Sequence, residues 1–286
     1  MKPESIAEIM IDGNTRLIAH LGYPTETFKA PMIYNPYFEK HGINALVVPM
    51  GCAADDYTAF FRPLFRLSNV GGALVTMPHK ISTLALLDEV SVSAKIAGAC
   101  NVVRVDPGGK LIGDMFDGEG FVRSVKRGGR ALAPARILVI GNGGVGSAIA
   151  AALAKAGVAE IALFDSDAAA MNRLAERLGA YYPKQKVTLG SNDPAGFDIV
   201  VNATPLGMKA GDPLPIDVTH LSPATLVGEV VMKDEITPLL AAARQRGCEY
   251  RLGTDMLFEQ IPACLEFFGF PAATADELRE ISRIHY

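Results

Sequence analysis

The chain of 286 residues has few cysteines, no excess of basic residues and no long apolar segment. Its cysteines, Cys52, Cys100, Cys248 and Cys264, are dispersed without a CxxC pair. This spacing indicates neither a zinc site nor the disulfide framework of a small secreted domain. We therefore expect reduced thiols, no bound metal and a cytoplasmic protein.

The net charge of the chain limits the kinds of binding partner that we expect. A formal net charge of −4 provides no general basic field that would attract nucleic acid or an acidic membrane surface. The first residues, MKPESIAEIMIDG, are acidic and polar where a secretory signal needs an apolar stretch, and no run reaches membrane-spanning length. We therefore expect a small-molecule ligand and neither nucleic-acid nor membrane partners. The oligomeric state stays open, with a homodimer as one option.

The most informative segment present is ARILVIGNGGVGSAIAAALAKAG, at residues 135–157. The apolar run Ile137–Ile140 is typical of a buried parallel strand and leads into GNGGVG, a GxGxxG pattern at a strand-to-helix turn. Glycines there let the backbone turn tightly and approach a pyrophosphate, while the start of the helix offers free N–H groups and a positive dipole end. The segment predicts a dinucleotide site.

The next strand, Ile161–Phe164, ends at Asp165. An acidic residue about 20 positions after the first glycine typically binds the ribose hydroxyls, and its charge repels a 2′-phosphate. We therefore expect NAD rather than NADP, although Asp167 could share this role and Arg173 could still reach a phosphate. The residues expected to bind the cofactor here are Gly141, Asn142, Gly143, Gly144, Val145, Asp165 and Ser166.

Apolar runs alternate with helix-like segments along the whole chain, which is typical of α/β folds. The strands expected are residues 15–20, 45–49, 72–76, 137–140, 161–164, 187–189, 199–202 and 226–231, and the main helices are 31–41, 54–67, 79–87, 118–126, 145–157, 168–179, 256–268 and 275–284. We predict an α/β substrate domain at residues 1–116, completed by the helices of 256–286. Residues 117–255 are predicted to form a Rossmann domain with a doubly wound parallel sheet.

Outside the glycine loop, polar residues follow strand-like segments in ALVTMPHK, GACNVV and GDMFDG. Lys80 follows Pro78 near an expected helix start, and Asp117 lies between turn-forming glycines. A lysine and a carboxylate together can orient a hydroxyl and exchange its proton while a hydride moves to the cofactor. A surface salt bridge is the alternative, and spacing alone leaves both open.

Taken in order, these motifs resemble the shikimate and quinate dehydrogenase family over nearly the whole chain. The matching segments are Gly22 and Pro24 with APMIYN, then VTMPHK, GACN, GDMFDG, GNGGVG, NATPLGM, KDEITPLL and GTDMLFEQ. The resemblance implies an enzyme that exchanges a hydride between a nicotinamide cofactor, which the charge of Asp165 predicts to be NAD, and shikimate, quinate or a less polar cyclic analogue. It also implies Lys80 and Asp117 as the catalytic pair. It further implies substrate contacts from Thr76, Asn101 and Gln260, and nicotinamide contacts from Asn202, Thr204, Leu206, Val230 and Gly253.

The substrate side departs from the family pattern. The family loop is similar to HSxSP, whose two hydroxyls hold the substrate carboxylate, whereas Phe28 and Ala30 stand at those positions here. Losing two hydrogen bonds to a carboxylate, at roughly 1.5 to 3 kcal/mol each, would lower shikimate affinity by about a hundredfold or more. Other changed positions are Tyr34, Leu74, His79, Met115, Phe116 and Met232.

Two interpretations of these changes stay open. Lys29, Tyr34 or His79 could bind an acid from a new direction, or Phe28, Leu74 and Phe116 could face an apolar substrate group. Met232, at the position of a family tyrosine near the nicotinamide, is also expected to line the substrate site.

Two other functions are alternatives to the dehydrogenase. One is a nucleotide-sensing regulatory protein that has lost catalysis, which the altered carboxylate loop would explain. The other is a methylene dehydrogenase of the folate type, against which NATPLGM and GDMFDG argue.

Overall fold

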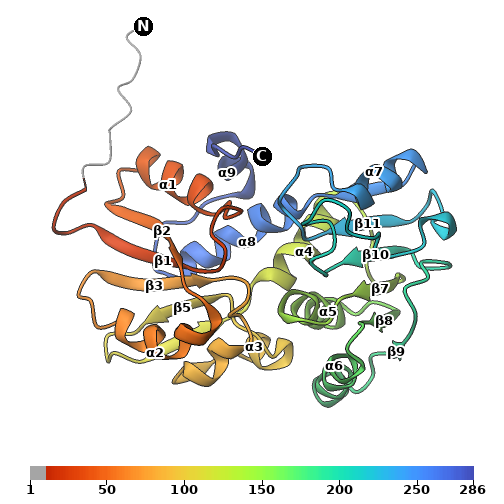
Figure 1. Cartoon of the computed structure of the whole chain (residues 1–286), viewed down its shortest axis with the longest axis horizontal. Coiled ribbons are helices and arrows are strands. Elements are labelled where there is room, and N and C mark those ends of the chain that lie inside the picture. Colours follow the sequence, from red (N-terminus) through yellow and green to blue (C-terminus); the bar gives the residue numbers. More distant parts are fainter. Residues whose placement is uncertain (1–10) are drawn as a thin grey trace, which may run out of the picture. The chain divides into compact units, whose positions relative to one another are not determined.

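The computed structural model describes residues 11–286 (Figure 1). The segment MKPESIAEIM, on which the prediction of no secretory signal mainly depends, lies outside the described residues. From residue 11 onward, no helix combines the length and apolarity needed to cross a bilayer.

The described chain divides into two compact units. The first contains the residues up to Val90, Cys100–Asp114 and Ile261–His285, and the second contains Ser91–Ala99, Met115–Gln260 and Tyr286. The sequence predicts a first domain of residues 1–116, whereas in the structure Ser91–Ala99 belongs to the second unit. This segment groups there because its helix packs on two other helices of the second unit.

The first unit is built on a six-stranded mixed sheet of order β2-β1-β3-β5-β6-β4. Its strands are β1 (Arg16–Gly22), β2 (Ala45–Gly51), β3 (Val70–Val75), β4 (Glu89–Val90), β5 (Val102–Val105) and β6 (Leu111–Asp114). Its helices are α1 (Pro31–Lys40), α2 (Ala54–Leu64), a 3-10 helix (Ser82–Leu86), the part of α8 (Gly253–Phe267) from Ile261 onward, and α9 (Ala275–Ile281). The strands β1, β2 and β3 run parallel, and β5 runs antiparallel to both β3 and β6.

One face of this sheet carries the apolar core that orients β1 and β3. Alternate residues of the two strands, including Leu21 and Val75, pack in one buried cluster with Tyr57 and Phe61 of α2. Because successive side chains of a strand point to opposite faces, the residues between them face the other side of the sheet. In Figure 1, α1 and α9 lie on that other side and α2 lies on the core side.

The second unit holds a six-stranded sheet of order β12-β11-β10-β7-β8-β9, in which all paired strands are parallel. Its strands are β7 (Arg136–Ile140), β8 (Glu160–Phe164), β9 (Val187–Leu189), β10 (Ile199–Asn202), β11 (Leu226–Glu229) and β12 (Glu249–Arg251). Its helices are α3 (Val92–Ala97), α4 (Asp117–Arg127), α5 (Gly144–Ala156), α6 (Ala168–Tyr181), a 3-10 helix (Val218–His220), α7 (Pro238–Gln245) and the first residues of α8. The predicted α/β fold with a doubly wound parallel sheet is confirmed.

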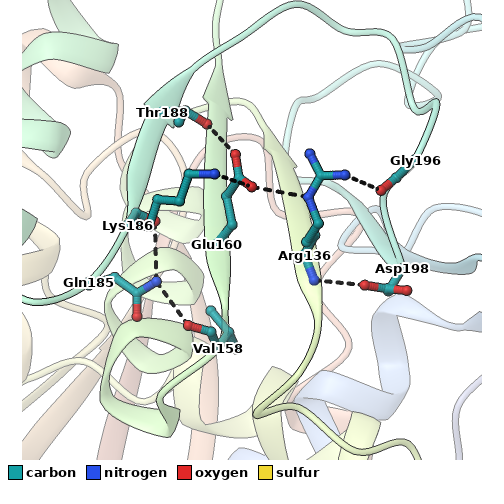
Figure 2. Close-up of polar contacts among 8 residues, drawn as sticks. All are labelled: Arg136, Val158, Glu160, Gln185, Lys186, Thr188, Gly196 and Asp198. Atoms are coloured by element: carbon teal, nitrogen blue, oxygen red, sulfur yellow. Dashed lines mark hydrogen bonds and ion pairs between the residues drawn. The ribbon is translucent and has the colours of Figure 1, made fainter.

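A charged cluster ties together the amino ends of three strands in the second sheet (Figure 2). The Glu160 carboxylate at the start of β8 accepts hydrogen bonds from Arg136 Nε at 3.0 Å, Lys186 Nζ at 2.9 Å and Thr188 Oγ1 at 3.1 Å. Arg136 also donates to the carbonyl of Gly196. The cluster lies at the edge of the sheet opposite the glycine loop, because that loop follows the carboxyl end of β7.

Replacing Glu160 with glutamine is expected to lower the free energy of unfolding by about 1 kcal/mol at pH 7, because two charge-assisted hydrogen bonds weaken while their cationic partners stay largely in solvent. The hydrogen bond from Lys186 is the main cause that lowers the pKa of Glu160. A lowered carboxyl pKa stabilises the fold above the unfolded value, and this contribution is lost as pH falls through the folded value. Urea unfolding at pH 7 and pH 4 measures the effect, with Glu176→Gln on the exposed face of α6 as control. An equal difference between wild type and Glu160→Gln at both pH values would contradict the assignment.

Candidate active site

The glycine loop between β7 and α5 forms an open cradle. Gly141 has a φ of +88°, and a side chain there would strike the backbone of Ala203 at 2.8 Å. A Cβ at Gly146 would lie 1.8 Å from the Gly141 carbonyl oxygen, so that α5 can begin this close to the loop only with glycine. A Cβ at Gly143, by contrast, would meet nothing within 4 Å. The loop therefore leaves space where a pyrophosphate needs it, and these residues fit a dinucleotide.

The amino end of α5 supplies the donors for this cradle. The helix begins at Gly144 without a side-chain cap and without an acidic residue in its first turn. The first N–H groups of a helix have no partner within the helix and carry a partial positive charge. Ser147 Oγ donates to the carbonyl of Asn142 at 2.9 Å and fixes the loop against the helix. The Asn142 side chain is buried, and its amide atoms have no partner within residues 11–286.

Asp165, the residue expected to hold the ribose, is bound to the backbone. Its Oδ2 accepts from the Asn142 N–H at 2.5 Å, and its Oδ1 accepts from the Asp167 N–H at 2.9 Å. Asp167 in turn caps α6 and lies 3.4 Å from the guanidinium of Arg173. Ser166 Oγ reaches the same Asp165 oxygen at 3.4 Å. Asp165 thus has a structural role in shaping the loop.

A buried carboxylate organises the loop after β10. Asn202 Nδ2 donates to Glu229 at 2.9 Å and to the carbonyl of Leu206 at 3.1 Å. Asn202 Oδ1 accepts from Thr204 Oγ1 at 2.6 Å, and Thr204 Oγ1 accepts from the Leu206 N–H at 3.1 Å. Burial raises the pKa of Glu229, against hydrogen bonds from Val231 and others that lower it. The three nicotinamide residues predicted in NATPLGM therefore form one hydrogen-bonded turn.

The other predicted nicotinamide residues lie together in the second unit. A Cβ at Gly253 would lie 2.6 Å from the Val231 carbonyl oxygen, 3.1 Å from the Val230 carbonyl carbon and 2.8 Å from Met232 Cγ. Glycine at this position lets the start of α8 lie directly against the segment that follows β11. Val230, Met232 and Gly253 are thus neighbours in the folded unit.

Lys80 lies in a turn after β3, two residues before the 3-10 helix, and is half-buried. Its carbonyl accepts from the Cys100 N–H at 2.8 Å, which joins the VTMPHK and GACN motifs through the backbone. The neighbouring Asn101 is buried, its carbonyl accepts from the Val75 N–H and its N–H donates to the Asp114 carbonyl. The Thr76 N–H donates to the carbonyl of Leu21. These contacts bring Lys80, Thr76 and Asn101 to the same end of the first sheet.

Asp117 belongs to the second unit and is the first residue of α4. It is 2 % exposed and lies in the helix's first turn, where the helix dipole favours negative charge. Two glycines hold this end of α4 against other helices. A Cβ at Gly118 would lie 2.0 Å from the Ala148 carbonyl oxygen, and one at Gly120 would lie 2.4 Å from that of Met256. Gln260 follows on the same stretch of α8, and the same added Cβ at Gly120 would lie 2.9 Å from the Gln260 Cβ.

The loop that replaces the family hydroxyls is largely packed inside the first unit. Ala30 is buried at the start of α1, and Phe28 is half-buried with its ring stacked on His20 at 4.1 Å between centroids. A Cβ at Gly22 would lie 2.8 Å from Phe28 Cζ and 2.4 Å from Thr76 Cγ2. The Phe28 ring therefore lies beside Thr76 at the carboxyl ends of β1 and β3.

The three residues predicted as possible new acid-binding groups are all buried in the first unit. The Lys29 amine is buried and donates to the carbonyl of His285. Burial raises the pKa of Tyr34 well above its usual value. His79 stacks on Tyr57 with ring centroids 3.7 Å apart, and its Nε2 donates to the Cys52 carbonyl at 2.7 Å.

Two residues that sequence reasoning did not select belong to these clusters. Glu229 is the only charged residue in the run LVGEVV, and His20 interrupts the apolar run LIAHLG. A polar residue in an otherwise buried strand is costly unless it is paired, and this was the available signal. Among the described residues, no group of three His, Cys, Asp or Glu side chains is arranged to hold a metal ion.

Comparison with known proteins adds family evidence to this geometry. The model of the shikimate dehydrogenase substrate binding domain matches residues 21–103, and that of the ThiF family matches residues 121–178. A curated protein of Rubrobacter xylanophilus, named shikimate dehydrogenase (NADP(+)), is 37% identical over 87% of this chain and 89% of its own length. One of Acidiphilium cryptum with the same name is 35% identical over 94% of this chain and 96% of its own. The resemblance predicted from the motifs is confirmed.

Solved structures agree over nearly the whole length. The shikimate 5-dehydrogenase of Listeria monocytogenes, in complex with shikimate and NAD, superposes with a TM-score of 0.83 at 28% identity, covering 95% of this chain and 97% of that one. The quinate dehydrogenase of Corynebacterium glutamicum, in complex with NAD, gives 0.82 at 29% identity, with coverage of 93% and 98%.

The prediction of NAD as cofactor is wrong, because the curated relatives are named as NADP(+) enzymes. The hydrogen bonds of Asp165 give the physical reason why this residue is a poor indicator of the cofactor. Its two carboxylate oxygens accept hydrogen bonds from the N–H groups of Asn142 and Asp167, so the geometry of the loop is enough to account for an acidic residue at this position. Its presence therefore does not decide between the two cofactors.

Proposed function

Because the chain belongs to the shikimate dehydrogenase family, we propose that it exchanges a hydride between NADP(H) and the ring carbinol of shikimate or a closely related cyclic hydroxy acid. The chain is an oxidoreductase of CH–OH donors, as are the curated relatives that span 87% or more of it. The observation that carries the proposal is the cradle at Gly141, Gly143 and Gly146, built in a chain whose relatives are named for this reaction. The regulatory alternative finds no support among those relatives.

In this proposal Lys80 and Asp117 form the catalytic pair. The amine and the carboxylate would hold the reacting hydroxyl by hydrogen bonds and exchange its proton, and most of their contribution would be positioning. Thr76, Asn101 and Gln260 would orient the ring, with Phe28, Ala30 and Met232 also lining the substrate site. The bound nicotinamide supplies the hydride chemistry.

The second unit would hold the cofactor. The first N–H groups of α5 would bind the pyrophosphate, and the turn of Asn202, Thr204 and Leu206 with Val230 and Gly253 would border the nicotinamide. Arg173, an exposed cation beside Asp167, is the first arginine of α6 and would pair with the 2′-phosphate. Asp165 would stay on the loop backbone. A homodimer and a cytoplasmic location stay predictions of the sequence.

The test is reduction of NADP(+) followed at 340 nm with shikimate, quinate and an acyclic hydroxy acid as control. We expect steady turnover with NADP(+) and at least one of the two ring acids, and none with the acyclic acid. Tight NADPH binding without turnover of either ring acid would contradict the proposal and restore the regulatory alternative.

A further inference from the structure

His20 occupies an unusual place on β1. It pairs in register with Leu74 of β3 and Pro49 of β2, one residue from Leu21, whose side chain packs in the α2 core. Side chains alternate along a strand, so His20 and Leu74 face the side of the sheet opposite that core. The imidazole therefore lies near the carboxyl ends of the two strands.

The His20 side chain is buried without being satisfied. It is 7 % exposed, and its Nδ1 has no hydrogen-bond partner in the described part of the chain. Only one other described side chain, Asn142 in the dinucleotide loop, has such buried unpartnered atoms. Buried polar groups are nearly always paired, and each exception in a folded protein calls for an explanation, of which a ligand contact is one.

The neighbours of His20 are residues of the proposed substrate site. Its ring stacks on that of Phe28, with the ring centroids 4.1 Å apart and 30° between the ring planes. The side chains of Phe28 and Thr76 both lie close to Gly22. His20 is also close enough to Lys80 for the two to interact electrostatically. Burial, reinforced by the positive charge of Lys80, lowers the pKa of His20 to about 3. The imidazole is thus neutral at physiological pH.

We propose, resting on the proposed function, that His20 is a specificity-determining residue whose imidazole hydrogen-bonds a ring hydroxyl of the substrate beside Phe28. A neutral imidazole nitrogen either donates or accepts a hydrogen bond, depending on the tautomer, and a hydroxyl can form the hydrogen bond in both cases. A carboxylate only accepts, and it would favour a protonated imidazole that this site disfavours. The inferred ligand is therefore an uncharged hydroxyl of a cyclic polyol, contacted on a wall that is otherwise aromatic and apolar.

Two substitutions separate the polar atom from the ring. His20→Phe keeps the stack on Phe28 and removes Nδ1, whereas His20→Asn keeps a polar group near the Nδ1 position. Titration calorimetry with shikimate and with its uncharged methyl ester, without cofactor, is expected to give about tenfold weaker binding of both probes by His20→Phe, the loss of one neutral hydrogen bond. His20→Asn should stay within about threefold of wild type on the same reasoning. His20→Phe should also melt higher than wild type, because an unpaired buried atom is removed.

The outcomes are distinct. Unchanged affinity in His20→Phe, or a loss for shikimate but not for its ester, would overturn the role of His20 while leaving the proposed function intact. If wild type binds shikimate but does not reduce NADP(+), and His20→Phe binds shikimate more weakly than wild type, the role of His20 is supported and the proposed function is contradicted. Failure of wild type to bind either probe would overturn both. If His20→Phe does not fold, the ¹⁵N shift of His20 Nδ1 in wild type decides, since it should move on addition of shikimate and an unmoved shift overturns the proposal.

Discussion

Replacing Lys80 with methionine is expected to lower kcat for the ring acid by about 10³-fold, within the range that a positioned proton-transfer group contributes. The amine would be lost, while the Lys80 carbonyl would still accept from the Cys100 N–H and keep the turn in place. The Kd for NADP(+) should change by less than about twofold, because the glycine loop belongs to the other unit. Stopped-flow and steady-state rates measure the first effect, and fluorescence titration measures the second.

The matched control for this variant is Lys110→Met. Lys110 is an exposed lysine of the first unit, with its side chain 58% accessible and paired with Glu89 at 2.7 Å. We expect no change in kcat, since exposed ion pairs contribute little. Turnover of Lys80→Met within tenfold of wild type would rule out Lys80 as a catalytic residue. A fall in NADP(+) affinity equal to the fall in kcat would instead indicate a folding defect.

Replacing Gly143 with alanine is expected to weaken NADP(+) binding by about a hundredfold without lowering the melting temperature. A Cβ at this position meets no protein atom within 4 Å, and its backbone is extended, so the folded chain accepts alanine freely. The methyl group would instead enter the space assigned to the pyrophosphate, and a hundredfold loss corresponds to about 2.7 kcal/mol. Calorimetric titration with NADP(+) and thermal unfolding of the unliganded protein measure the two quantities.

Two further glycine variants serve as controls for Gly143→Ala. Gly146→Ala places a Cβ 1.8 Å from the Gly141 carbonyl oxygen and should reduce both stability and NADP(+) affinity. Gly179→Ala on α6 meets nothing within 4 Å and should affect neither, apart from a small gain in helix propensity. Unchanged NADP(+) affinity in Gly143→Ala would show that the pyrophosphate does not lie over this loop.

Local patterns were enough to predict most elements of the second unit. The strand at Ile137, its glycine turn and the helix that follows need only a buried β-branched run, glycines at fixed spacing and alanines in sequence. The predicted strand 187–189 has the same bounds as β9. The hairpin of β5 and β6 was not predicted, because VVRV and LIGD are too short to show alternation and pair with each other only across a turn.

Sequence alone thus predicted the family and the α/β class, which are confirmed, and the glycine loop, because each depends on residues that are adjacent in the chain or on motifs in a fixed order. It could not establish which polar atoms have partners, since hydrogen bonds join residues far apart in the chain. Only the folded structure distinguished Asp165, whose carboxylate is occupied by the loop backbone, from His20, whose Nδ1 is buried without a partner. The first observation gives Asp165 a role in the loop that does not depend on the cofactor, and the second is the one on which the proposed role of His20 in substrate specificity rests.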